Sequence, residues 1–154
     1  MINRRKLFLT VLVVLGLVLP IKSAQAACTL RGASIAFGTY DPISLTPLDT
    51  AGAVIYRCAG SDHNITITLS RGGGATFATR RMIKGSEQLF YNLYRDAART
   101  AIWGDGTGGT QSFFIGNPQA NNTDLSVPIF GRIPAGQNVS KGSFSDTITV
   151  TLIF

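Results

Sequence analysis

The chain has 154 residues, of which 45% are hydrophobic and 14% are charged, and its formal net charge is +6. Four of the 14 basic residues lie at positions 4–22, which leaves ten basic against eight acidic residues beyond them and a net charge of +2. A nucleic-acid-binding protein is therefore not indicated, because most of the basic excess lies in the first segment. The remaining length is sufficient for one domain with its own core.

The first 26 residues have the organisation of a cleavable signal peptide. They open with three basic residues, continue with an apolar run over 7–21, and end in Ala-Gln-Ala. A membrane anchor is the alternative, but the run is shorter than the roughly 20 residues that a spanning helix needs. A lipoprotein is disfavoured, because Gln25 occupies a position where its processing site requires a large aliphatic residue. We expect a signal peptide over 1–26 and a mature domain over 27–154.

The two cysteines, Cys28 and Cys58, both lie in the mature region. In an exported protein an even pair is most simply a disulfide, and closing a loop of this length should stabilise the fold by about 3–4 kcal/mol. A redox or metal-binding pair is the alternative. It has little support, because the spacing is not C-x-x-C and no histidine is adjacent.

Short alternating strands dominate the mature region, and no segment in it has the 3.6-residue apolar period of a helix. The clearest strand is 63–70, where Ile65, Ile67 and Leu69 alternate with polar residues. Glycine-rich and polar stretches separate the strands as turn material. The pattern predicts an all-β protein, an antiparallel sandwich in a single domain. The expected strands, in chain order, are 30–37, 54–58, 63–70, 80–84, 89–94, 112–115, 125–133 and 147–154.

The last of these strands needs a partner. Ile148, Val150, Leu152 and Phe154 share one face and alternate with threonines, so that face expects cover from another strand. An exposed apolar strand is an aggregation hazard unless something pairs with it. An earlier strand of the same chain or a strand from another protein could give that cover, and the pattern favours neither.

No catalytic or metal-binding constellation emerges from the sequence. The single histidine, His63, stands at the start of a strand and is expected to be a surface residue. There is no G-x-S-x-G elbow, no close acidic pair and no metal-ligand spacing, so we expect no enzyme activity, no cofactor and no metal. Asp96 and Asp105 flank Trp103 and could bind a sugar or an ion, but we expect them to bond to turn amides.

A short basic cluster lies on one expected strand. It consists of Arg80, Arg81 and Lys84. Such clusters are typical of a solvated face or of the protection of an edge strand, and we expect that role here.

Several spaced motifs follow one another along the mature region. They are Phe37-Gly38-x-Tyr40, Cys58, Arg81-Met82, Leu89-x-Tyr91-Asn92-Leu93-Tyr94-x-Asp96, Trp103-Gly104-Asp105-Gly106, Gly131-Arg132-Ile133 and Gly142-x-Phe144-x-Asp146-Thr147-Ile148-x-Val150-Thr151. In this order they resemble the spore coat protein U domain family over essentially all of 28–154. Phe130 and Phe144 stand where a tyrosine is expected, which removes a hydroxyl and keeps the ring.

The resemblance implies an incomplete immunoglobulin-like β-sandwich that lacks its last strand. Many members are subunits of archaic chaperone–usher pili in biofilm-forming Gram-negative bacteria, and others are spore coat proteins. In such pili a periplasmic chaperone lends a strand beside the subunit's C-terminal strand, and a neighbour's N-terminal extension later replaces it. The implied partners are a periplasmic chaperone, an outer-membrane usher and other pilus subunits. The implied location is the periplasm and then the cell surface or pilus, with the membrane met only during export.

The family's features can be placed on this sequence residue by residue. The acceptor groove would be bordered by Ile148, Val150, Leu152 and Phe154. The paired cysteines of the family match Cys28 and Cys58. Structural aromatic residues of the core would be Tyr91, Tyr94 and Trp103.

One departure from a polymerising pilin concerns the donor segment. A donor strand needs about ten or more residues ahead of the first strand, at about 3.3 Å per residue. Cleavage after residue 26 leaves only Ala27 ahead of Cys28. We therefore expect an accepting subunit at the tip or in a minor position. The alternatives are a spore or cell-surface coat protein and a stand-alone carbohydrate- or surface-binding adhesin, in which Phe113, Phe114 and Ile115 could touch surfaces if they are not a core strand.

Overall fold

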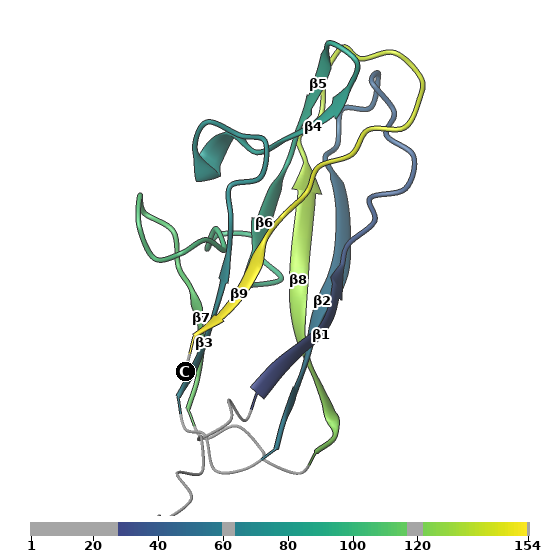
Figure 1. Ribbon diagram of the computed structural model, residues 1–154. Coiled ribbons are helices and arrows are strands. Elements are labelled where there is room, and N and C mark those ends of the chain that lie inside the picture. The colour runs from purple at the N-terminus through teal and green to yellow at the C-terminus, as the bar shows by residue number, and fades with distance from the viewer. Residues whose placement is uncertain (1–27, 60–63, 117–121, 154) are drawn as a thin grey trace, which may run out of the picture.

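The computed structural model describes residues 28–59, 64–116 and 122–153, which form an antiparallel β-sandwich (Figure 1). The first sheet has the strand order β1 (Cys28–Ser34), β2 (Leu48–Cys58), β8 (Asp124–Ile133) and β6 (Asn92–Tyr94). The second has the order β7 (Phe113–Ile115), β3 (Ile65–Leu69) and β9 (Val150–Ile153). A hairpin of β4 (Arg81–Lys84) and β5 (Glu87–Phe90) follows the short 3₁₀ helix η1 (Phe77–Thr79). The predicted all-β class is confirmed.

The alternation of the sequence decides which side chains enter the space between the two sheets. On β3, Ile65, Ile67 and Leu69 are buried while the threonines between them are only half-buried. On β8 the buried positions include Val127 and Ile129, again at every second residue. These faces meet between the layers and make the core, as the period-2 pattern predicted.

The predicted strand 89–94 is two strands of different sheets. Leu89 belongs to β5 and pairs with β4, whereas Leu93 belongs to β6 and pairs with β8. Between them the backbone N–H of Tyr91 donates to the carbonyl of Arg80 at 3.0 Å. The prediction of one strand was wrong, because a run of alternating apolar residues does not show where the chain changes partner.

Other strands differ from the prediction at their ends. β1 begins at Cys28, which faces Cys58 in the register of β1 and β2, and it ends at Ser34. β9 comprises Val150–Ile153, so Ile148 precedes the strand. Phe154, His63 and the predicted signal peptide over 1–26 lie outside the described residues.

Arg80 is buried, although the basic cluster predicted a solvated side chain. Its relative exposure is 0%. The guanidinium donates to the carbonyls of Ser70 and Trp103 and to the side-chain oxygen of Asn92, at 2.7–3.1 Å. Burial lowers the pKa of Arg80 to about 10, so it remains charged at neutral pH. The prediction was wrong for this residue because its three acceptors come from separate segments that only the fold brings together.

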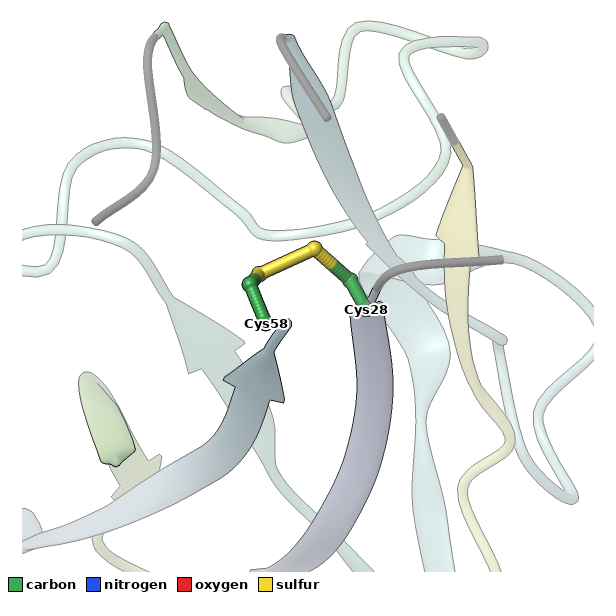
Figure 2. The surroundings of a disulfide bond; sticks show 2 residues. All are labelled: Cys28 and Cys58. Carbon is green, nitrogen blue, oxygen red and sulfur yellow. A yellow bond between two sulfur atoms is a disulfide. The ribbon is translucent and has the colours of Figure 1, made fainter. Parts of the chain in front are cut away.

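The predicted disulfide joins Cys28 to Cys58. Figure 2 shows the two side chains meeting between the start of β1 and the end of β2. The bond therefore fastens neighbouring strands of one sheet rather than the two sheets of the sandwich. Disulfides of this kind persist in oxidising compartments outside the cytosol.

One side of the sandwich is closed by the segment between β6 and β7. Trp103 in this segment is fully buried. Its backbone N–H donates to the Leu93 carbonyl in the first sheet at 2.9 Å, and its indole N–H donates to the Ile67 carbonyl in the second sheet at 3.0 Å. The ring of Phe113 packs on the indole at 5.4 Å. A single residue thus connects both layers, through its backbone to the first sheet and through its side chain to the second.

The turns of this segment are held by two carboxylates. Asp96 accepts from the backbone N–H groups of Thr100 and Ala101, and Asp105 accepts from the backbone N–H and hydroxyl of Thr107. These hydrogen bonds lower the pKa of both carboxyl groups. The expectation that the two aspartates bond to turn amides is confirmed.

Candidate functional site

Two sheet edges face each other on the other side of the sandwich. β1 is the edge strand of the first sheet and β9 is the edge strand of the second. Within residues 28–59, 64–116 and 122–153, no strand pairs with the free edge of either. Backbone N–H and C=O groups along such an edge are available to a further strand.

A cleft with two connected chambers lies between these edges. The larger chamber has a volume of about 1160 Å³ and is lined by the segments 35–42 and 139–146. The smaller chamber, of about 230 Å³, lies between β1 and the chain around Ile148 and Val150. Ile35 and Asp146 line both chambers, so the two adjoin each other.

The floor of the cleft is the apolar core. Buried residues at its base come from β3, β5, β6 and β8, and among the residues that the structure describes Asp146 is the only charged one lining the smaller chamber. The floor residues of the two chambers together are Leu69, Met82, Leu89, Tyr91, Leu93, Ile129 and Ile133.

The wall of the cleft that follows β1, residues 35–42, packs closely on Gly131. A Cβ atom at Gly131 would lie 2.7 Å from Phe37 Cζ and 2.8 Å from Ile35 Cδ1, so only glycine allows these side chains to pack here. The Phe37 ring meets Tyr91 edge-on at 5.5 Å. These contacts turn the chain after β1 inward along the cleft.

Tyr40 ties this wall to the segment that follows β8. Its hydroxyl donates to the carbonyl of Pro134 at 3.1 Å and accepts from the backbone N–H of Gln137 at 2.8 Å. The Gln137 side chain in turn bonds both backbone groups of Phe90 on β5, at 2.7 and 2.8 Å. The far end of the larger chamber is therefore held by side-chain hydrogen bonds.

Along the opposite wall the exposure of the side chains alternates over ten residues, of which only the last four belong to β9. From residue 144 to 153 half-buried and exposed side chains follow one another strictly. The pairing of β9 with β3 determines which side chains point inward. The same alternation holds before the strand begins, because Ser70 N–H donates to the Thr149 carbonyl at 2.9 Å. The residues that point inward are Phe144, Asp146, Ile148, Val150 and Leu152.

Asp146 is held at the junction of the two chambers. Its carboxylate accepts from the Tyr91 hydroxyl at 2.7 Å, from Gly73 N–H at 2.9 Å and from Thr147 N–H at 2.8 Å. Burial and the hydrogen bond to Asp146 raise the pKa of the Tyr91 hydroxyl well above its usual range. The tyrosine therefore stays protonated and remains a donor.

Lys84 anchors the outer part of the second wall. Its ammonium lies 2.7 Å from Glu87 and donates to the backbone carbonyls of Ser140 and Lys141 at 3.1 and 2.7 Å and to the Ser140 hydroxyl. It also lies over the Phe144 ring, 4.9 Å from the centroid. Hydrogen bonds from Lys84 and Ser140 lower the pKa of Glu87.

The residues predicted for the groove are placed as follows. Ile148 and Val150 line the smaller chamber, and Leu152 lies farther along β9, half-buried against the core. Sequence reasoning missed the opposite wall over 33–42 and the part played by Asp146. The alternation that carries Ile148 and Val150 extends back to Phe144, and that was the available signal for Asp146.

The apolar residues considered for surface contact have different positions. Phe113 packs on Trp103, while Phe114, its neighbour in β7, is exposed. The most exposed apolar side chains are Ile43 and Leu45 in the loop between β1 and β2, at 87% and 95%. Sequence reasoning did not identify these two.

The described part of the chain contains neither a cluster of metal ligands nor a membrane-spanning helix. No three His, Cys, Asp or Glu side chains come together there as metal ligands would. No helix in the same residues has the length and apolar character that crossing a bilayer requires.

Comparisons with known proteins agree with the fold. Residues 15–151 match the family described as Spore Coat Protein U domain. Protein U of Myxococcus xanthus is 33% identical over 136 residues, which cover 80% of this chain and 73% of that protein.

Two solved structures resemble the chain in fold. One is the CsuC-CsuE chaperone–tip adhesion subunit pre-assembly complex from the archaic chaperone-usher Csu pili of Acinetobacter baumannii, with a TM-score of 0.56 and 18% identity. The match covers 82% of this chain but only 39% of that chain. The other is the P pilus rod subunit PapA, with a TM-score of 0.52, 14% identity, and coverage of 83% and 99%. Both share the immunoglobulin-like sandwich of pilins.

Proposed function

The chain belongs to the Spore Coat Protein U domain family, and on that premise we propose that it is a structural subunit of a secreted surface assembly. In this role it accepts a β-strand from another protein in the cleft between β1 and β9. The assembly is an archaic chaperone–usher pilus. The partners are a periplasmic chaperone, an outer-membrane usher and other pilus subunits.

The observation that carries this proposal is the cleft itself. It runs between two free strand edges and over an apolar floor. An added strand would complete the hydrogen bonding of both edges while its alternate side chains fill the chambers, which is the physics of strand addition. Covering the edges would also remove an aggregation hazard.

Export and the absence of catalysis belong to the same proposal. The signal peptide over 1–26 would direct the chain to the periplasm, where oxidation can form the Cys28–Cys58 bond. From there the subunit would reach the cell surface. We propose no enzyme activity, since the floor of the cleft is made of apolar core residues and suits packing rather than chemistry.

A tip or minor position in the fibre is a further part of the proposal. It rests on the predicted cleavage after residue 26, which would leave Ala27 alone ahead of Cys28. Sequencing the N-terminus of the exported protein tests it. A mature chain that keeps ten or more residues ahead of Cys28 would contradict the terminal position.

The experiment for strand acceptance compares neighbouring residues of β9. Val150→Glu places a charge in the cleft, whereas Thr151→Glu places the same charge on the exposed face. Co-expressed with the cognate chaperone, wild type and Thr151→Glu should form a stable one-to-one complex, and Val150→Glu should not. A chain that stays monomeric and soluble without any chaperone, or a complex indifferent to Val150→Glu, would contradict the proposal.

Surface adhesion is a second candidate, favoured by one observation. Ile43 and Leu45 project almost fully into solvent from a loop held by Asp41 and Ser44 hydrogen bonds. A protein that works in a coat or as a free-standing adhesin could use such a tip. Retention of the folded domain on apolar and glycan surfaces, compared with an Ile43→Ser and Leu45→Ser variant, tests this role.

A further inference from the structure

One wall of the cleft has a charged residue between apolar ones. On the wall of Phe144 to Leu152 the inward residues are apolar except Asp146. Because alternate residues of a strand lie about 6.6 Å apart, a strand laid along this wall would place one side chain opposite each of them. One of those side chains must face the carboxylate.

Among the described residues Asp146 forms no ion pair, unlike the carboxylates Asp49 and Asp124 of strands β2 and β8. Asp49 lies beside Arg132 and Arg99, and Asp124 lies beside Arg57. The three contacts of Asp146 are all with neutral donors.

The buried Arg80 guanidinium attracts Asp146 through space but forms no ion pair or hydrogen bond with it. The N–H groups of the Arg80 guanidinium donate hydrogen bonds to Ser70, Asn92 and Trp103. In the larger chamber the other charged lining residues are Asp41 and Lys141, which are both exposed. In the smaller chamber Asp146 is the one charged lining residue of the described chain.

A strand that covered this carboxylate with an apolar or acidic side chain would bury an unpaired charge. Such burial is costly, whereas an opposite charge within hydrogen-bond reach offsets the cost. Asp146 would therefore favour one kind of partner and exclude others, which is how buried charges give specificity.

We propose that Asp146 selects the strand that the cleft accepts. The partner strand carries a lysine or arginine at the position facing Asp146, with apolar residues at the alternate positions on either side. This inference rests on the proposed function, since it concerns the occupant of the same cleft.

The test uses synthetic twelve-residue peptides of alternating threonine and apolar residues. One inward position, flanked by apolar ones, is lysine, methionine or glutamate, and each peptide is made for both strand directions. The full-length mature chain is refolded with each peptide, and affinity is measured by fluorescence anisotropy. We expect the lysine peptide to bind at least about tenfold more tightly than the methionine and glutamate peptides, which corresponds to about 1.4 kcal/mol.

Variants locate the origin of the preference. Asp146→Asn can still accept hydrogen bonds but has no charge, and it should reduce the preference for lysine over glutamate to within about twofold. Asp105→Asn, in an exposed turn, removes the same charge away from the cleft and should leave the preference intact. The chain's net charge is positive, so a general electrostatic effect would favour glutamate instead.

The outcomes separate the two proposals. Equal binding of the lysine and glutamate peptides to wild type, or a preference unchanged in Asp146→Asn, overturns the role of Asp146 and leaves strand acceptance standing. If Asp146→Asn does not fold, the loss of the wild-type preference at high salt replaces that comparison, because screening weakens a charge pair. Binding of none of the peptides in either direction overturns both.

Discussion

The two sides of the sandwich solve the problem of exposed strand edges in opposite ways. On one side Trp103 bonds to carbonyls of both sheets and packs on Phe113, so the layers are joined. On the other side β1 and β9 face each other across a cleft that reaches the core. The same fold therefore contains one completed side and one that is open to a further strand.

The free strand edges also differ in how well they are protected against pairing with another strand. The first part of β8 pairs with β2 only, and Pro128 stands there, a residue that cannot donate to another strand. β9 has neither proline nor charge in Val150–Ile153. The difference indicates that the edge of β9 is suited to pairing, whereas the edge of β8 resists it.

The largest expected effect comes from opening the completed side. Trp103→Ala removes a fully buried ring and the indole hydrogen bond to the Ile67 carbonyl, and it should lower the free energy of unfolding by about 3–5 kcal/mol. Urea denaturation checks this. Trp103→Phe, which keeps a ring in place, should cost less; equal costs would mean that the stabilisation depends on the indole hydrogen bond and the full ring volume, and that a smaller ring contributes little.

The next largest effect concerns the strand that borders the open side. Replacing Cys28 and Cys58 by serine releases a loop with a sequence separation of 30 residues and should cost about 3–4 kcal/mol in the chain-entropy account. Urea denaturation of the double variant beside the oxidised protein measures it. Reduced wild type should match the double variant, and a difference between them would show that the serines themselves disturb β1 or β2.

A smaller loss is expected when the wall of the cleft is loosened. Tyr40→Phe removes the hydroxyl that bonds Pro134 and Gln137 and should cost about 0.5–1.5 kcal/mol for each bond. Thermal denaturation measures the loss of stability. Peptide binding to the cleft should weaken as well, because the wall over 35–42 would be less firmly held. Unchanged binding would show that this end of the cleft does not contact the occupant.

The smallest effect lies on the outer face of the first sheet, away from both sides. The hydrogen bond from Arg132 lowers the pKa of Asp49. Its stabilisation is therefore present above the ordinary aspartate pKa of about 3.9 and is lost as the pH falls through the lower folded-state pKa. The stability difference between wild type and Asp49→Asn, under about 1 kcal/mol at neutral pH for a partly exposed pair, should shrink in urea titrations below about pH 4. A constant difference would contradict the ion-pair explanation.

The strand faces that were predicted correctly are those where apolar and polar residues alternate along the sequence. Ile65, Ile67 and Leu69 follow period 2 and are buried, and the inward face of Val150 and Leu152 follows the same rule. The disulfide followed from the count of cysteines in a chain that was predicted to be exported. Local periodicity is enough to assign such faces, because each side chain's direction depends only on its neighbours.

The features that escaped prediction depend on contacts between distant segments. The strand switch at Tyr91 follows a bond to Arg80, and the burial of Arg80 requires acceptors from Ser70, Asn92 and Trp103. The wall formed by 33–42 requires the absence of a side chain at Gly131. None of these has a local signature, so only the assembled structure reveals them.

The position of the disulfide has a mechanical consequence. Tension applied to the chain ahead of Cys28 passes through the sulfur bridge into Cys58 at the end of β2. The residues from Cys28 to Cys58 then form a covalently closed loop that bears no load. β1 and the wall that continues from it lie inside this loop, so in a subunit pulled from that end this wall of the cleft would lie outside the path of the force.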